Sequence, residues 1–309
     1  ELAECLLDTD VTVENDEDEY LDMGLEELVE EKIASIHLKE LAAHILYAAY
    51  MVSPPEQRAE ELFQYYQKDM FRQIPLETML RVGKAELPDL PAFWDSWIQL
   101  LSRQQGVKAL WLLKETIRSQ FDAGKMLEVA REAYEIHPSL YLEALEMMKG
   151  SASERQRTEV GKEALEKVDV RYVIRSRIAR ETAGAALRSG QESVAAVCWR
   201  EAFLSDSTPT NYLRWVNESG EPEECGTVAR RMASQLPKKQ NFGAVSLDSS
   251  LYRMPDEQTE NALVSYSGTI LRFLAGDFDY AWSKCQKEKE PLGWTGHFVK
   301  CGISLCLLL

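Results

Sequence analysis

The stretch that decides the fold class is residues 176–209, SRIARETAGAALRSGQESVAAVCWREAFLSDSTP. Two segments with helical periodicity meet at Gly190, a residue that readily adopts the left-handed backbone conformation at the end of a helix. Ala195 and Ala202 are small enough to let two helix backbones approach closely, and Trp199 can fill the space beside them. The stretch therefore predicts a hairpin of two antiparallel helices.

With these residues the hairpin resembles a tetratricopeptide repeat (TPR). The resemblance makes Gly190 the turn glycine, Ala195 and Ala202 the two small residues, and Trp199 with Phe203 the large packing residues. It implies a stack of helix pairs and a scaffold that binds other proteins, and it implies no reaction.

Helical periodicity also marks most of the remaining chain. Apolar residues recur at spacings near three and four over residues 25–52, which predicts one long amphipathic helix. Ser53, Pro54 and Glu56 then predict the start of the next helix, because they can supply an N-cap, a first-turn proline and a capping-box glutamate. Further helices are expected around residues 93–101, 110–113, 130–134, 141–145, 211–216 and 228–236.

We expect three regions along the chain. Residues 1–24 are an acidic linker or loop, residues 25–150 an N-terminal helical array, and residues 151–309 a C-terminal TPR-like array continuous with the first. Segments with strand periodicity are almost absent, which predicts an all-α fold. The resemblance to TPR proteins implies an irregular α-solenoid or right-handed superhelix of antiparallel helix hairpins. A second match to the repeat lies around Gly276, in LRFLAGDFDYAWSKC.

Composition and charge narrow the class of partner. Hydrophobic residues make up 45% of the 309 and charged residues 28%, which is typical of a folded protein. A net charge of -16 disfavours nucleic acid and membrane surfaces and favours a basic protein or peptide as partner. Six cysteines without paired spacing, and no signal peptide or membrane-spanning run, predict a cytoplasmic location. The chain begins without Met and ends in an apolar run, so we expect a piece of a longer protein.

Three residues are predicted to contact the partner. The inner faces of the first helices in each pair would carry specificity, which selects Arg180, Arg188 and Tyr212. Arg180 and Arg188 belong to a basic patch that also contains Arg171, Arg175 and Arg177 and could meet an acidic peptide or a phosphate. The alternative interpretation is that these arginines pair with glutamates on adjacent helices.

The best candidates for metal ligands are His37, Glu40 and His44, which would share one face of the helix predicted over residues 25–52. A catalytic zinc needs three clear ligands, and a di-iron bundle needs a repeated set of carboxylates that the sequence lacks. No nucleophile elbow or phosphate-binding glycine loop occurs either. We therefore expect no metal, no cofactor and no enzyme, and a metal-dependent helical enzyme is the third alternative.

A second resemblance lies in residues 199–215, WREAFLSDSTPTNYLRW, which are similar to helical segments that accompany SWIM-type zinc fingers. It implies a helical accessory region of a larger nucleic-acid-linked protein. The cysteine and histidine signature of the finger is absent from the sequence, so zinc and nucleic-acid binding are not implied for this chain.

Overall fold

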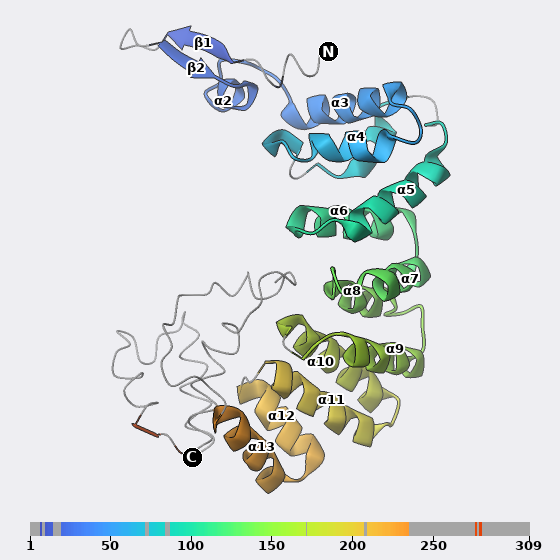
Figure 1. Cartoon of the computed structure of the whole chain (residues 1–309), viewed down its shortest axis with the longest axis vertical. Helices are drawn as coiled ribbons and strands as arrows, with labels where there is room; N and C mark the ends of the chain where they lie inside the picture. The colour runs from blue at the N-terminus through green and yellow to red at the C-terminus, as the bar shows by residue number, and fades with distance from the viewer. Residues whose placement is uncertain are drawn as a thin grey trace. The chain divides into compact units, whose positions relative to one another are not determined.

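The chain is mostly helical (Figure 1). The computed structural model describes Leu7, Gly276 and residues 10–14, 20–71, 74–83, 87–170, 172–206, 209–234 and 278–279. The chain forms two compact units, Glu1–Gln120 and Phe121–Leu309. The boundary between the units lies after residue 120, whereas the sequence placed it after residue 150. The helix of residues 139–147 packs against the two helices that follow it, and it therefore belongs to the second unit.

A small β-hairpin lies within residues 1–24, where the sequence predicted an acidic linker or loop. Strand β1 (Val11–Glu14) pairs antiparallel with β2 (Tyr20–Met23). Val13 lies opposite Leu21, so apolar side chains share one face of the hairpin. Each strand has only four residues, so the alternation of apolar and polar side chains is too short to be recognised next to the acidic residues.

The prediction of a single helix over residues 25–52 is wrong. The structure contains two helices there, α2 (Leu25–Glu30) and α3 (Leu38–Val52). Lys32 has a φ of 61°, a left-handed conformation that cannot continue an α-helix. His37 is the extended N-cap residue of α3. The apolar pattern runs through this break without showing it.

The next helix begins later than the sequence predicted. Helix α4 (Arg58–Tyr65) has Gln57 at its N-cap, so Pro54 lies outside its first turn. The buried Arg58 guanidinium donates from Nε to the carbonyl oxygen of Tyr50 at 3.0 Å, which ties the start of α4 to α3. The unit continues through the short 3-10 helices η1 (Asp69–Phe71) and η2 (Leu76–Arg81) to α5 (Leu90–Arg103) and α6 (Val107–Gln120).

Aromatic side chains form the core of the first unit. Trp97 of α5, a helix predicted from its apolar spacing, is fully buried. Its ring lies 5.9 Å from Phe93 and 6.1 Å from Tyr66, measured between centroids. Its Nε1 donates to Thr116 Oγ1 of α6 at 3.1 Å, so the indole is both packed and hydrogen-bonded.

Over residues 123–234, each helix of the second unit packs against its neighbours in sequence, and α8 also contacts α10 (Figure 1). The helices are α7 (Ala123–Ala133), α8 (Ser139–Met147), α9 (Glu154–Lys167), α10 (Val173–Arg188), α11 (Glu192–Ser205), α12 (Pro209–Ser219) and α13 (Pro222–Ser234).

The hairpin predicted around Gly190 is confirmed as α10 and α11. Gly190 has a φ of 72°, the left-handed conformation expected of the turn. Ala195 and Ala202 are fully buried, as the close approach of helices requires. Of the second repeat match, around Gly276, nearly all lies outside the described residues; Gly276 itself has a φ of 86°.

Helices α9 and α10 also approach closely, at Gly161. A Cβ atom placed there would overlap the side chain of Thr182. Thr182 Oγ1 donates to the carbonyl oxygen of Ile178 at 2.7 Å, which holds the threonine in this position. The glycine is therefore required by the contact between the two helices.

Candidate functional site

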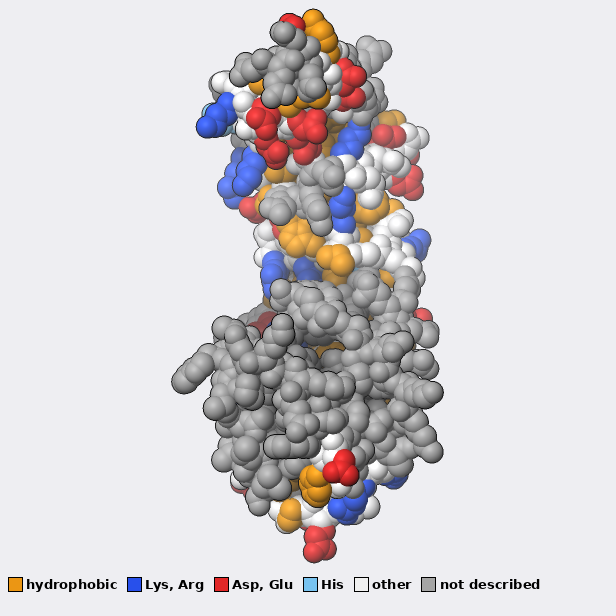
Figure 2. All heavy atoms as spheres, turned by 90° about the vertical axis from the view of Figure 1, so that its left-hand side faces the viewer, with side chains coloured by type: hydrophobic (Ala, Val, Ile, Leu, Met, Phe, Trp, Pro, Cys, Tyr) orange, Lys and Arg blue, Asp and Glu red, His pale blue; other side chains and the backbone are white. Residues whose placement is uncertain are grey.

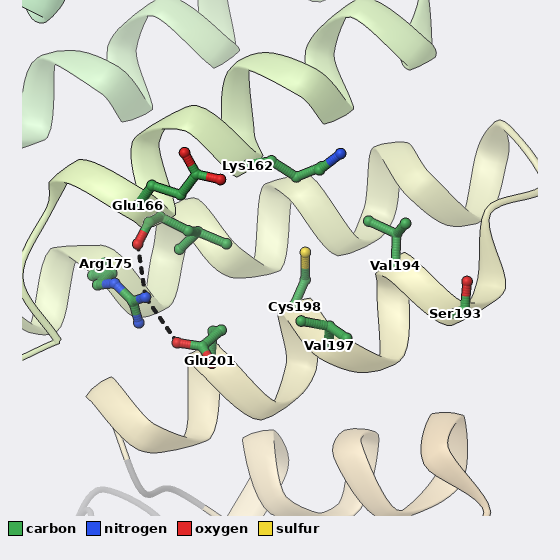
Figure 3. Close-up of a pocket in the computed structure, with 9 residues that line it drawn as sticks. Lys162, Glu166, Arg175, Ser193, Val194, Val197, Cys198 and Glu201 are labelled. Carbon is green, nitrogen blue, oxygen red and sulfur yellow. Dashed lines mark hydrogen bonds and ion pairs between the residues drawn. The ribbon is translucent and has the colours of Figure 1, made fainter.

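A groove of about 520 Å³ lies between α9 and α11 in the second unit (Figure 3). Leu165 of α9 and Val194, Val197 and Cys198 of α11 supply its apolar lining. Val197 and Cys198 follow Val194 by three and four residues, so both lie on the same side of the helix as Val194. Val197 is 57% exposed. A groove of this size and lining can accept aliphatic side chains.

A shielded ion pair closes one end of the groove. Arg175 Nη2 lies 2.7 Å from Glu201 Oε2, and the Arg175 side chain is only 8% exposed. Nη2 also donates to the carbonyl oxygen of Leu165 at 2.8 Å, and Nη1 donates to Ser205 Oγ at 3.3 Å. The guanidinium therefore joins α9, α10 and α11. For Arg175, pairing with a glutamate on an adjacent helix is confirmed.

The rim of the groove is polar and charged. Lys162 Nζ is paired with Glu159 Oε2 on the same helix at 3.1 Å. Glu166 is exposed and makes no ion pair with any residue that the structure describes. Figure 3 shows Glu166 at the same end of the groove as Arg175 and Glu201. One carboxylate of the rim is thus available to a ligand.

The thiol of Cys198 lines the groove as apolar surface. Burial, with a contribution from the nearby Glu201 carboxylate, raises the pKa of this thiol to about 12. The sulfur therefore stays protonated at neutral pH, and a thiol is a far weaker nucleophile than a thiolate.

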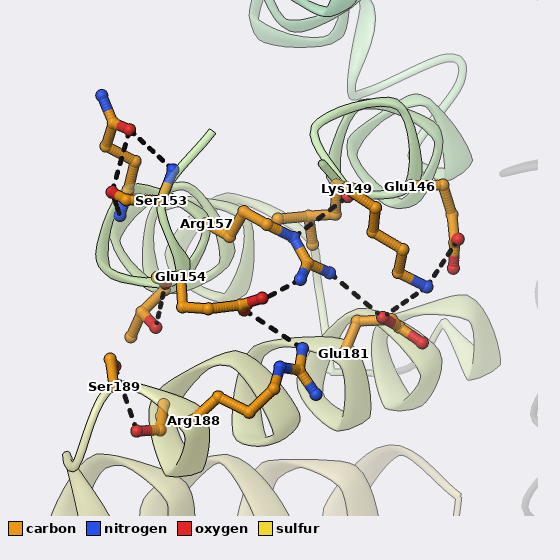
Figure 4. Close-up of polar contacts among 12 residues, drawn as sticks. Glu146, Lys149, Ser153, Glu154, Arg157, Glu181, Arg188 and Ser189 are labelled. Atoms are coloured by element: carbon orange, nitrogen blue, oxygen red, sulfur yellow. Dashed lines mark hydrogen bonds and ion pairs between the residues drawn. The ribbon is translucent and has the colours of Figure 1, made fainter. Parts of the chain in front are cut away.

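Arg188, one of the predicted contact residues, belongs to a network of ion pairs between helices (Figure 4). Its Nη2 lies 3.1 Å from Glu154 Oε2, which also accepts from Arg157 Nη1 at 2.9 Å. Arg157 is 2% exposed and also reaches Glu181 Oε2 at 3.3 Å. The Arg188 guanidinium holds the pKa of Glu154 below its usual value. The charge of Arg188 is therefore balanced within the protein.

The other two predicted contact residues lie in different surroundings. Arg180 is exposed on α10 and attracts the carboxylate of Asp206, whose pKa burial nevertheless raises to about 6. Tyr212 is 7% exposed and packs against Phe203 and Trp215 in the core. None of the three predicted residues lines the groove.

The three candidate metal ligands do not share one helix face. His37 precedes α3 in an extended conformation, while Glu40 and His44 lie within the helix. Nδ1 of His44 lies 2.8 Å from the carbonyl oxygen of Glu40 and is engaged with the backbone. Within the described ranges, no group of three or more His, Cys, Asp or Glu side chains could hold a metal ion.

Sequence reasoning missed Val197 and Glu166. A signal existed for Val197, because the apolar face of α11 extends beyond the alanines that match the TPR pattern. No sequence signal distinguishes Glu166 from the other glutamates of α9, because its free carboxylate depends on which cations the neighbouring helices bring close.

A scan against protein-family models and a search of curated proteins found no match to this chain. No helix in the described part of the chain is long and apolar enough to cross a bilayer.

Proposed function

We propose that this protein is a non-catalytic scaffold that binds a protein or peptide through the groove between α9 and α11. The observation that carries the proposal is the groove itself, with an aliphatic lining and a charged rim. Val197 supports it, because an aliphatic side chain gains by leaving water when a partner covers it.

The order in which the helices contact one another supports an irregular α-solenoid or right-handed superhelix of antiparallel hairpins, similar to TPR proteins. In the second unit each helix packs against its neighbours in sequence, as in repeat proteins that stack hairpins. In such a stack every second helix faces the same side. Helices α9 and α11 would then belong to one extended binding surface, formed by the second helices of each pair and not by the first helices from which the contact residues were predicted.

Charge supports a basic partner. Positive and negative side chains are interspersed over the described residues on the face shown in Figure 2, but the whole sequence carries a net charge of -16. This charge repels nucleic acid and anionic membranes and attracts basic proteins. The unpaired buried thiols of Cys198 and Cys225 suit a reducing compartment, which supports a cytoplasmic location.

Site-specific photo-crosslinking tests this function. Benzoyl-phenylalanine at Val197 should link the protein to a defined partner in a lysate of its source, and Val194→Asp should abolish that product. Leu213 of α12, an exposed apolar residue outside the groove, is the matched control position. The same products from both positions, or none from position 197, would contradict the proposal.

A further inference from the structure

We infer that the groove selects peptide segments in which a Lys or Arg stands beside an aliphatic residue. Glu166 would bind the cation, and Leu165, Val194 and Val197 would hold the aliphatic side chain. This inference rests on the proposed function and adds the chemical class of the partner.

A ligand can pair only with a carboxylate of the groove that is not already paired. Glu201 and Glu166 both line the groove. Glu201 already binds two cations, Arg175 at 2.7 Å and Arg200 at 3.3 Å. Glu166 has no cationic partner among the described residues, so it is the carboxylate that an incoming ammonium or guanidinium group can pair with.

The cations of the groove are already engaged. Lys162 is paired with Glu159, and Arg175 is buried in its contact with Glu201. An acidic peptide would have to compete with these carboxylates. The available charge of the groove is therefore negative, and it favours a basic ligand over an acidic one.

The carboxylate that would bind the cation and the lining that would hold the aliphatic group lie next to each other. Glu166 follows Leu165 directly in α9, and both side chains line the groove. Val197 and Val194 lie across it on α11 (Figure 3). Adjacent or next-adjacent residues of an extended peptide, about 3.3 Å apart per position, can reach both features.

Selection from a displayed library of random twelve-residue peptides tests this inference with the whole protein. Peptides enriched by the wild type should share a Lys or Arg beside an aliphatic residue. Replacing that cation by Glu should weaken binding roughly five- to tenfold in fluorescence anisotropy. Glu166→Lys should reverse the preference, while Glu132→Lys, an exposed carboxylate on α7 outside the groove, should leave it unchanged.

The outcomes separate the inference from the proposed function. Enrichment that Val197→Lys abolishes but Glu166→Lys leaves unchanged would overturn the basic class and keep the groove as a peptide site. If the wild type enriches peptides no more than Val197→Lys does, both the inference and the proposed function are overturned. Circular dichroism confirms that each variant is folded, and Ser193→Trp, which fills the groove from an exposed position, replaces Val197→Lys if that variant unfolds.

Discussion

Glu115 should make the stability of the first unit fall as the pH rises. Its carboxylate on α6 accepts hydrogen bonds from the backbone N–H groups of Leu76 and Glu77 at the start of η2. Its Oε2 atom is buried and has no hydrogen-bond partner among the described residues. Burial, and then the nearby Glu77 carboxylate, raise the pKa of Glu115 from 4.5 to about 7.

The sign of the effect follows from the two states of the chain. Below pH 4.5, Glu115 is protonated in both the folded and the unfolded protein, and its contribution to stability is fully present. As the pH rises toward 7 the unfolded chain loses this proton more readily, so the contribution is lost. The difference in pKa corresponds to at most about 3 kcal/mol, and partial exposure of the side chain reduces it to about 1–2 kcal/mol.

The substitution Glu115→Gln removes the titration and keeps an acceptor for η2. We expect this variant to be about 1–2 kcal/mol more stable than the wild type at pH 8, with the difference disappearing near pH 4.5. Urea unfolding of the wild type and the variant between pH 4.5 and 8, followed by tryptophan fluorescence, measures the difference in the free energy of unfolding.

Comparing each variant with the wild type at every pH cancels the other titrating groups, Asp206 among them. Glu132→Gln, at an exposed carboxylate of the second unit, is the control and should show no such dependence. Parallel pH profiles for the wild type and Glu115→Gln would refute the reasoning.

Three further predictions concern the second unit. Gly161→Ala should destabilise it by about 2 kcal/mol in thermal unfolding, because the added methyl group overlaps the side chain of Thr182. Adding Thr182→Ala should restore the stability of this variant. An unchanged melting temperature of Gly161→Ala would contradict the close contact. Arg157→Met should lower the free energy of unfolding in urea by about 3 kcal/mol, because it leaves the carboxylates of Glu154 and Glu181 without their buried partner. Arg188→Met, at an exposed ion pair, should lower it by less than about 1 kcal/mol. Equal losses of stability in the two variants would contradict this distinction between buried and exposed ion pairs. Val197→Lys should change stability by less than about 0.5 kcal/mol, because the position is exposed, and a larger loss in the same assay would show that Val197 belongs to the core.

The sequence alone determined the helical class and several individual helices. Gly190 marks a helix end because glycine adopts positive φ at little cost, and the structure has a φ of 72° there. The spacing of Phe93 and Trp97 predicted α5, because an apolar stripe of helical period must be buried. These features depend on neighbours within a few residues, which a sequence displays directly.

Only the tertiary structure decided where the long predicted helix breaks and which groups meet between helices. The left-handed Lys32 interrupts an apolar pattern that continues on both sides, so periodicity could not locate the break. The Arg175–Glu201 pair and the unpaired Glu166 depend on how α9, α10 and α11 pack. Their residues are far apart in sequence, and no local propensity specifies which charges or apolar faces the packing of helices will bring together.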